Sequence, residues 1–221
     1  ETTESFDAMR EREQREWADD LRRRVQLPTP DDATPRVCLL DSGVTRAHPL
    51  LAPLMNAEDL HTVEPAWGVD DEADHGTGLA GLAAYGDLTD ALSSVDPISI
   101  PHRLESVKLV PAEGANEGDA RHHAYLFTEG VARPEIAAPN RLRVFTSAVT
   151  ASDYRDRGRP SSWSAAVDGR GAKWILRNLN GTARKIQRNS LSLSRANRIV
   201  RFISTRFVRF SVHQRRSSEV Q

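Results

Sequence analysis

The feature that most constrains the fold is a four-residue apolar run, Val37-Cys38-Leu39-Leu40, which turn-forming segments bound on both sides. A Pro- and Asp-rich linker at residues 28–35 precedes the run, and Asp41-Ser42-Gly43 follows it. A short, continuously apolar segment is typical of a strand that is buried on both faces, as in a parallel sheet. Asp41 would then lie at the carboxyl end of a strand, where open α/β sheets build their sites.

The rest of the chain to residue 168 alternates between strand and helix patterns. Residues 106–110 and 143–149 are apolar enough to predict two further strands. Residues 76–85, rich in Gly, Ala and Leu, predict a buried helix with Gly86 as its C-cap, and residues 130–138 predict a short helix. This alternation predicts an α/β fold with a partial doubly wound parallel sheet.

An amphipathic helix is expected at the N-terminus, over residues 5–25. Phe6, Met9, Trp17 and Leu21 recur at intervals close to whole helical turns, and charged residues fill the other faces. Pro28 follows the segment and would end the helix. We therefore expect three parts: a helix and linker at 1–35, a domain at 36–168 and a basic tail at 169–221.

The basic tail is set apart by its charge. The formal net charge of the whole chain is -1, yet residues 170–221 hold 13 of the 30 lysines and arginines and one of the 31 acidic residues. A shifted reading frame or a recombined end would give such a tail, with a composition compatible with disorder. The alternative is an appendage that binds nucleic acid or an anionic membrane surface. The first explanation is favoured, because no known motif or regular amphipathic period supports the second.

Composition excludes several classes of protein. The single cysteine, Cys38, argues against a disulfide framework and a Cys-rich zinc site, and is expected to be a small core residue. No apolar stretch approaches the ~18 residues of a membrane span. The chain begins at Glu1 without a visible export signal, which suggests a processed product or fragment and a cytoplasmic location.

An acidic segment at residues 57–74 is predicted to be a loop. Asp70, Asp71, Glu72 and Asp74 lie close together in it, and a calcium site is conceivable. Because their spacing matches no calcium motif, a solvated acidic loop is the preferred interpretation.

Two short motifs carry the functional signal. The first is Asp41-Ser42-Gly43, and the second, His75-Gly76-Thr77-Gly78-Leu79-Ala80-Gly81, opens the predicted buried helix. An aspartate at a strand end can accept a hydrogen bond from imidazole Nδ1–H, which fixes the tautomer and stabilises the imidazolium. The small residues behind His75 would let its helix sink into the sheet beside Asp41. Each motif alone is equally typical of a turn aspartate or a helix-start histidine.

Together, in this order and at this separation, the motifs resemble the Asp and His motifs of subtilisin-like serine peptidases (subtilases). The resemblance implies a serine-type endopeptidase that acts on protein or peptide substrates without an organic cofactor. Asp41 would orient the imidazole, and His75 would be the general base and then the general acid. Thr146, Ser147 and Ala148 would line the substrate cleft. Metal ligands cannot be identified in the sequence, although structural calcium is frequent in the family.

A segment further along resembles a bacterial subset of the family. Residues 153–166 contain Arg-Asp-Arg-Gly and Pro-Ser-Ser-Trp-Ser, which are similar to subtilases encoded beside AAA-type ATPases. The resemblance implies an AAA-type ATPase as a partner.

The nucleophile motif of the family, Gly-Thr-Ser-x-Ala-x-Pro, does not occur in these 221 residues. The nearest string has Ala183 at the position of the serine, and the Ala-Gly-Asn turn of the oxyanion hole is also missing. Ser162 and Ser164 lack the flanking glycine and are interpreted as structural. The sequence therefore predicts a truncated subtilase that is inactive alone, although catalysis through an unrecognised serine such as Ser162 or Ser190 stays open.

Overall fold

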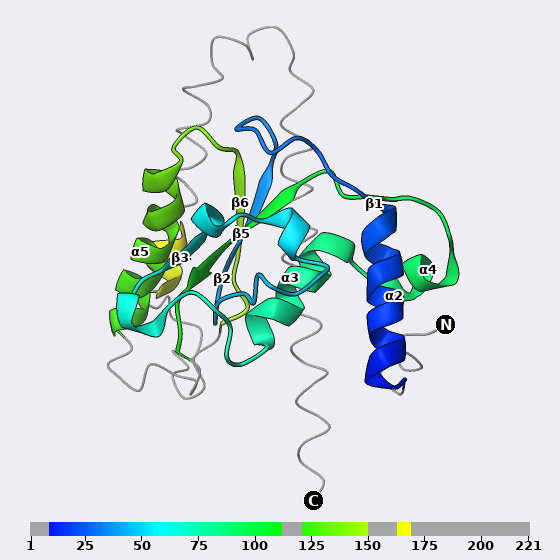
Figure 1. Cartoon of the computed structure of the whole chain (residues 1–221). Coiled ribbons are helices and arrows are strands. Elements are labelled where there is room, and N and C mark those ends of the chain that lie inside the picture. The colour runs from blue at the N-terminus through cyan, green and yellow to red at the C-terminus, as the bar shows by residue number, and fades with distance from the viewer. Residues whose placement is uncertain (1–8, 112–120, 150–162, 169–221) are drawn as a thin grey trace, which may run out of the picture. The chain divides into compact units, whose positions relative to one another are not determined.

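A computed structural model describes residues 9–111, 121–149 and 163–168 (Figure 1). Both sheets and the helices α2 to α5 lie within residues 11–146. The predictions for the tail at 169–221 lie outside the described residues and stay predictions.

Four parallel strands form the main sheet. Their order is β3-β5-β2-β6, with β2 and β5 in the middle. The strands are β2 (Arg36–Asp41), β3 (Leu60–Thr62), β5 (Arg103–Lys108) and β6 (Arg143–Thr146). A separate parallel pair joins β1 (Val25–Gln26) to β4 (Ile98–Ser99). The expected α/β fold with a parallel sheet is confirmed.

Alternate residues of β2 face two different hydrophobic clusters. Leu39 packs with Ala80 and Ala84 of helix α3 (His75–Tyr85). Cys38 and Leu40 pack in a second cluster with residues of helix α5 (Arg121–Ala137). The two helices lie on opposite sides of the sheet (Figure 1). Because successive side chains of a strand point to opposite faces, this continuous apolar run can feed both clusters.

Cys38 is the small core residue that the sequence predicts. Its thiol is free and fully buried. Burial raises the pKa of the Cys38 thiol well above its ordinary value. The thiol therefore stays protonated and unreactive.

Helix α5 is longer than expected, because it covers 17 residues where the sequence predicts a short helix at 130–138. Gly130, a poor helix former in the middle of the helix, conceals the part of α5 that precedes it. Gly130 has a packing role, since a Cβ there would lie 2.4 Å from Leu109 Cδ2.

The predicted loop at residues 57–74 also contains regular structure. Strand β3 lies within it, between the 3-10 helices Ala57–Asp59 and Pro65–Trp67. These elements are too short for a periodic pattern to reveal them.

Buried charges explain why the bounds of strand β5 differ from the prediction. Arg36, Arg103 and Arg143 lie in one register row at the amino ends of β2, β5 and β6. Glu105 is fully buried and accepts hydrogen bonds from Arg143 and from Arg141. Because Arg103 and Glu105 are charged, the apolar pattern predicted that the strand begins at residue 106, whereas β5 begins at Arg103.

Helix α2 (Glu11–Arg24) confirms the amphipathic helix but begins later than residue 5. Met9 and Arg10 are not helical, and residues 1–8 lie outside the described residues. The backbone N–H of Arg10, the N-cap residue, donates to the Glu13 side chain at 3.1 Å, and this bond caps the start of α2. Leu21 is buried between α2 and α4 (Leu88–Ser93), where it packs with Leu50 and Leu92.

The glycines of α3 have different roles, and this corrects the expectation that they all let the helix sink into the sheet. A Cβ at Gly76 would lie 2.1 Å from the carbonyl oxygen of Gly43, so only glycine permits this approach. A Cβ at Gly78 or Gly81 would meet no atom within 4 Å. The close contact is therefore confined to the first turn, and Ala80 and Ala84 face the sheet behind it.

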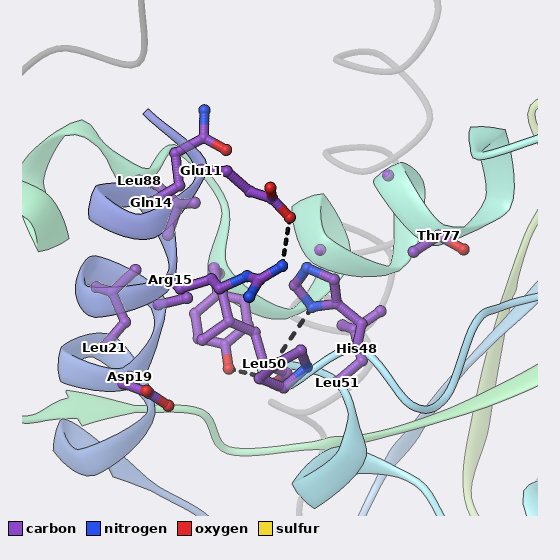
Figure 2. Close-up of a pocket in the computed structure, with 15 residues that line it drawn as sticks. Glu11, Gln14, Arg15, Asp19, Leu21, His48, Leu50, Leu51, Thr77 and Leu88 are labelled. Carbon is purple, nitrogen blue, oxygen red and sulfur yellow. Dashed lines mark hydrogen bonds and ion pairs between the residues drawn. The ribbon is translucent and has the colours of Figure 1, made fainter. Parts of the chain in front are cut away.

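Gly78 and Gly81 line a pocket of about 500 Å³ between α2 and α3. Figure 2 shows Arg15 extending from α2 toward the ring of His48, with Leu21 and Leu50 below. Neither Asp41 nor His75 lines this pocket.

Substitution of the α3 glycines tests these roles. We expect Gly76→Ala to destabilise the chain by about 1–3 kcal/mol, because the new methyl group overlaps the Gly43 carbonyl. Gly78→Ala is the control and should be neutral or stabilising by up to about 1 kcal/mol, because alanine favours helix and has free space there. Urea unfolding measures both, and equal effects would contradict the assignment.

Candidate active site

Asp41 and His75 are in direct contact. Asp41 ends strand β2, and its side chain is 2% exposed. His75 is the first residue of α3, and its Nδ1 lies 2.6 Å from Asp41 Oδ1. A carboxylate only accepts hydrogen bonds, so Nδ1–H is the donor in this contact, and in the neutral imidazole this tautomer leaves the lone pair on Nε2. The imidazole side chain is 54% exposed, so a buried acid holds an accessible base.

The turn after β2 fixes the carboxylate. The backbone N–H of Ser42 donates to Asp41 Oδ1 at 2.8 Å. Gly43 has a φ of 103°, and a Cβ there would lie 2.6 Å from the carbonyl oxygen of Val69. Glycine therefore lets the turn pack directly on the segment that leads to His75.

The first turn of α3 is capped by side chains from other segments. Asp74 is the N-cap, but its φ is 58° and its side chain accepts no capping hydrogen bond. The N–H of Gly76 donates to Ser42 Oγ at 3.0 Å, and the N–H of Thr77 donates to Asp71 Oδ2 at 2.7 Å. These bonds satisfy donors that a helix start leaves without an intrahelical partner.

Asp71 is a site residue that sequence reasoning missed, because the solvated acidic loop was the preferred interpretation. It is 7% exposed, and its Oδ1 accepts hydrogen bonds from Ser42 Oγ at 2.8 Å and from Ala73 N–H at 3.1 Å. Burial alone would raise the pKa of the Asp71 carboxyl, but the hydrogen bonds from Thr77, Ser42 and Ala73 outweigh burial and lower the pKa. An acidic side chain shortly before the start of a helix can accept hydrogen bonds from the first N–H groups of that helix. The position of Asp71, four residues before His75, is therefore the signal that could have identified it.

Lys108 was also missed. It ends strand β5 in register with Asp41, and its side chain is 1% exposed. Its Nζ donates to the carbonyl oxygen of Asp70 at 2.7 Å and lies 3.6 Å from Glu72 Oε2. A lysine inside an apolar strand pattern could have indicated a buried cation that needs such partners.

The predicted substrate-binding segment lies beside Asp41. Thr146 of β6 pairs with Leu39 of β2, and Ser147 Oγ donates to the carbonyl oxygen of Leu40 at 3.1 Å. Ala148 follows directly. The role of these residues in substrate binding stays a prediction.

The alternative serines are not placed at this site by any described contact. Ser162 and Ser190 lie outside the described residues. Ser164 belongs to a short helix at 163–168, whose Trp163 packs against Phe127 of α5, on the sheet face opposite α3.

Two other features are absent from residues 9–111, 121–149 and 163–168. These residues contain no group of three or more His, Cys, Asp and Glu side chains arranged to hold a metal ion. Within the same ranges, no helix has both the length and the apolar character needed to cross a membrane.

Comparison with known proteins gives one match. The model of the subtilase family (peptidase S8) matches residues 32–178, about two thirds of the chain. The match includes both the Asp41 and the His75 motifs. No curated protein and no solved structure is significantly similar to the chain.

The lowered pKa of Asp71 predicts an acid-dependent loss of stability. A carboxyl whose pKa is lower in the folded chain than in the unfolded chain stabilises the fold fully above its unfolded pKa of about 4. The contribution disappears as the pH falls through the folded value. We expect the stability difference between the unaltered chain and Asp71→Asn, from urea unfolding, to shrink below about pH 4. Asp70→Asn is the control, and a difference independent of pH would contradict the assignment.

Proposed function

The chain belongs to the subtilase family, and we propose that Asp41 and His75 are the acid and base of its peptide-hydrolysing site. The observation that carries the proposal is the 2.6 Å contact between the buried carboxylate and the half-exposed imidazole. The two residues come from the two motifs that resemble the family's Asp and His motifs.

The geometry suits general base catalysis. With Nδ1–H bound to Asp41, His75 Nε2 can take the proton of an attacking serine hydroxyl and later give it to the leaving amine. The carboxylate stabilises the imidazolium that forms between these two steps, and stays ionised itself. Thr146, Ser147 and Ala148, at the end of the neighbouring strand, would hold the peptide substrate.

These 221 residues do not supply the third member of the triad in the motif that the family uses. Loss of the serine costs a subtilisin-type site about 10⁶ in turnover, about as much as loss of the whole triad. In a site that is otherwise intact, loss of one oxyanion donor alone costs roughly 10²–10³ in turnover. We therefore propose that the chain, taken alone, does not hydrolyse peptides.

An AAA-type ATPase is the proposed partner, because residues 153–166 resemble subtilases encoded beside such ATPases. The motif that suggests the partner, at 153–166, falls mostly outside the described residues.

A fluorophosphonate probe tests the proposed inactivity, because it labels a serine that a working triad has activated. We expect the purified 221-residue chain to remain unlabelled and to leave a peptide substrate intact. Stoichiometric labelling of one serine, identified by mass spectrometry, would overturn the inactivity.

His75→Ala separates the two parts of this proposal. Labelling or hydrolysis that disappears in His75→Ala would identify His75 as the base of an active enzyme with an unrecognised serine. Hydrolysis that His75→Ala leaves unchanged would contradict the assigned role of His75.

A further inference from the structure

Asp71 is linked to His75 in two ways. The first connection runs through the helix backbone. Asp71 Oδ2 accepts from the N–H of Thr77 at 2.7 Å, two residues after His75. This bond fixes how the first turn of α3 sits relative to the acidic segment before it, and His75 begins that turn.

The second connection runs through the hydroxyl of Ser42. This hydroxyl accepts a hydrogen bond from the N–H of Gly76 at 3.0 Å and has one proton to donate. Two carboxylate oxygens compete for that proton, Asp71 Oδ1 at 2.8 Å and Asp41 Oδ1 at 3.2 Å. The nearer oxygen belongs to Asp71, so the proton points away from Asp41.

The direction of this proton matters for His75. Asp41 Oδ1 already accepts hydrogen bonds from Ser42 N–H at 2.8 Å and from His75 Nδ1 at 2.6 Å. A third donor on the same oxygen would compete with the imidazole. By taking the Ser42 proton, Asp71 leaves the Asp41 oxygen to His75.

Asp71 is itself held firmly. Its Oδ1 also accepts from the N–H of Ala73, and its side chain is almost fully buried. The preceding carbonyl, of Asp70, is bound by the buried Lys108 from strand β5. The segment is therefore tied to the sheet just before Asp71, and the carboxylate is also held by the backbone that follows it.

We infer that Asp71 is a positioning residue of the active site, which aligns His75 with Asp41 through Ser42 and the first turn of α3. The inference rests on the proposed function, in which His75 and Asp41 work as a pair. It assigns Asp71 a role in the site that the interpretation of its segment as a solvated acidic loop did not include.

Asp71→Asn is the informative substitution, because the amide has nearly the same shape but replaces one acceptor oxygen with a donor NH₂. If the NH₂ faces Ser42, the hydroxyl turns its proton to Asp41 Oδ1. If it faces Thr77, the helix start loses its acceptor. Both arrangements weaken the bond between His75 and Asp41.

The experiment records the low-field proton resonance of the His75 Nδ1–H in the full 221-residue chain by NMR. His75→Gln assigns the resonance through its loss. We expect the resonance in the unaltered chain and an upfield shift or loss in Asp71→Asn. Asp70→Asn is the matched control, since it removes the same charge one residue away, and it should leave the resonance unchanged.

Ser42→Ala keeps the test decisive if Asp71→Asn does not fold, which circular dichroism would show. It removes the hydroxyl that links the two carboxylates and should also shift the resonance. An unchanged resonance in folded Asp71→Asn, or in Ser42→Ala where Asp71→Asn is unfolded, would overturn the positioning role while leaving the pair intact. Absence of the resonance from the unaltered chain would instead contradict the pair, and with it the proposed function.

Discussion

The site depends on one close contact, between the first turn of α3 and the turn that ends β2. Gly76 and Gly43 meet backbone to backbone, at a distance that no Cβ would permit. This approach puts the N–H of Gly76 on Ser42 Oγ and the His75 ring on the Asp41 carboxylate. The two glycines thus allow the close approach that brings His75 into contact with Asp41.

Buried charged side chains have different partners at the two ends of the sheet. At the amino end, Glu105 accepts hydrogen bonds from Arg141 and Arg143, and Arg141 also binds Asp59, so the charges neutralise one another. At the carboxyl end, Asp41 is buried, and among the described residues its ion-pair contact is with His75, which is cationic when the ring is protonated. The first arrangement pairs charges that are permanent, and the second includes an imidazole, which under the proposed function transfers the proton.

Much of this arrangement could be predicted from residues that are close in sequence. The apolar run at 37–40 predicted the central strand, and the paired motifs predicted that Asp41 and His75 meet. Asp71 and Lys108 could not be assigned in the same way, because their roles depend on contacts with Ser42 and Asp70 that only the folded chain creates. The start of β5 could not be predicted for a similar reason, because the buried Glu105 is paired with Arg141 and Arg143, which are distant in sequence.

The central claim is that the end of β2 and the start of α3 hold Asp41 and His75 in contact. A crystal structure of the 221-residue chain would measure the separation of His75 Nδ1 and the nearer Asp41 carboxylate oxygen. The account predicts a hydrogen bond close to 2.6 Å. Side chains that lie beyond hydrogen-bonding distance and face different surfaces would contradict it.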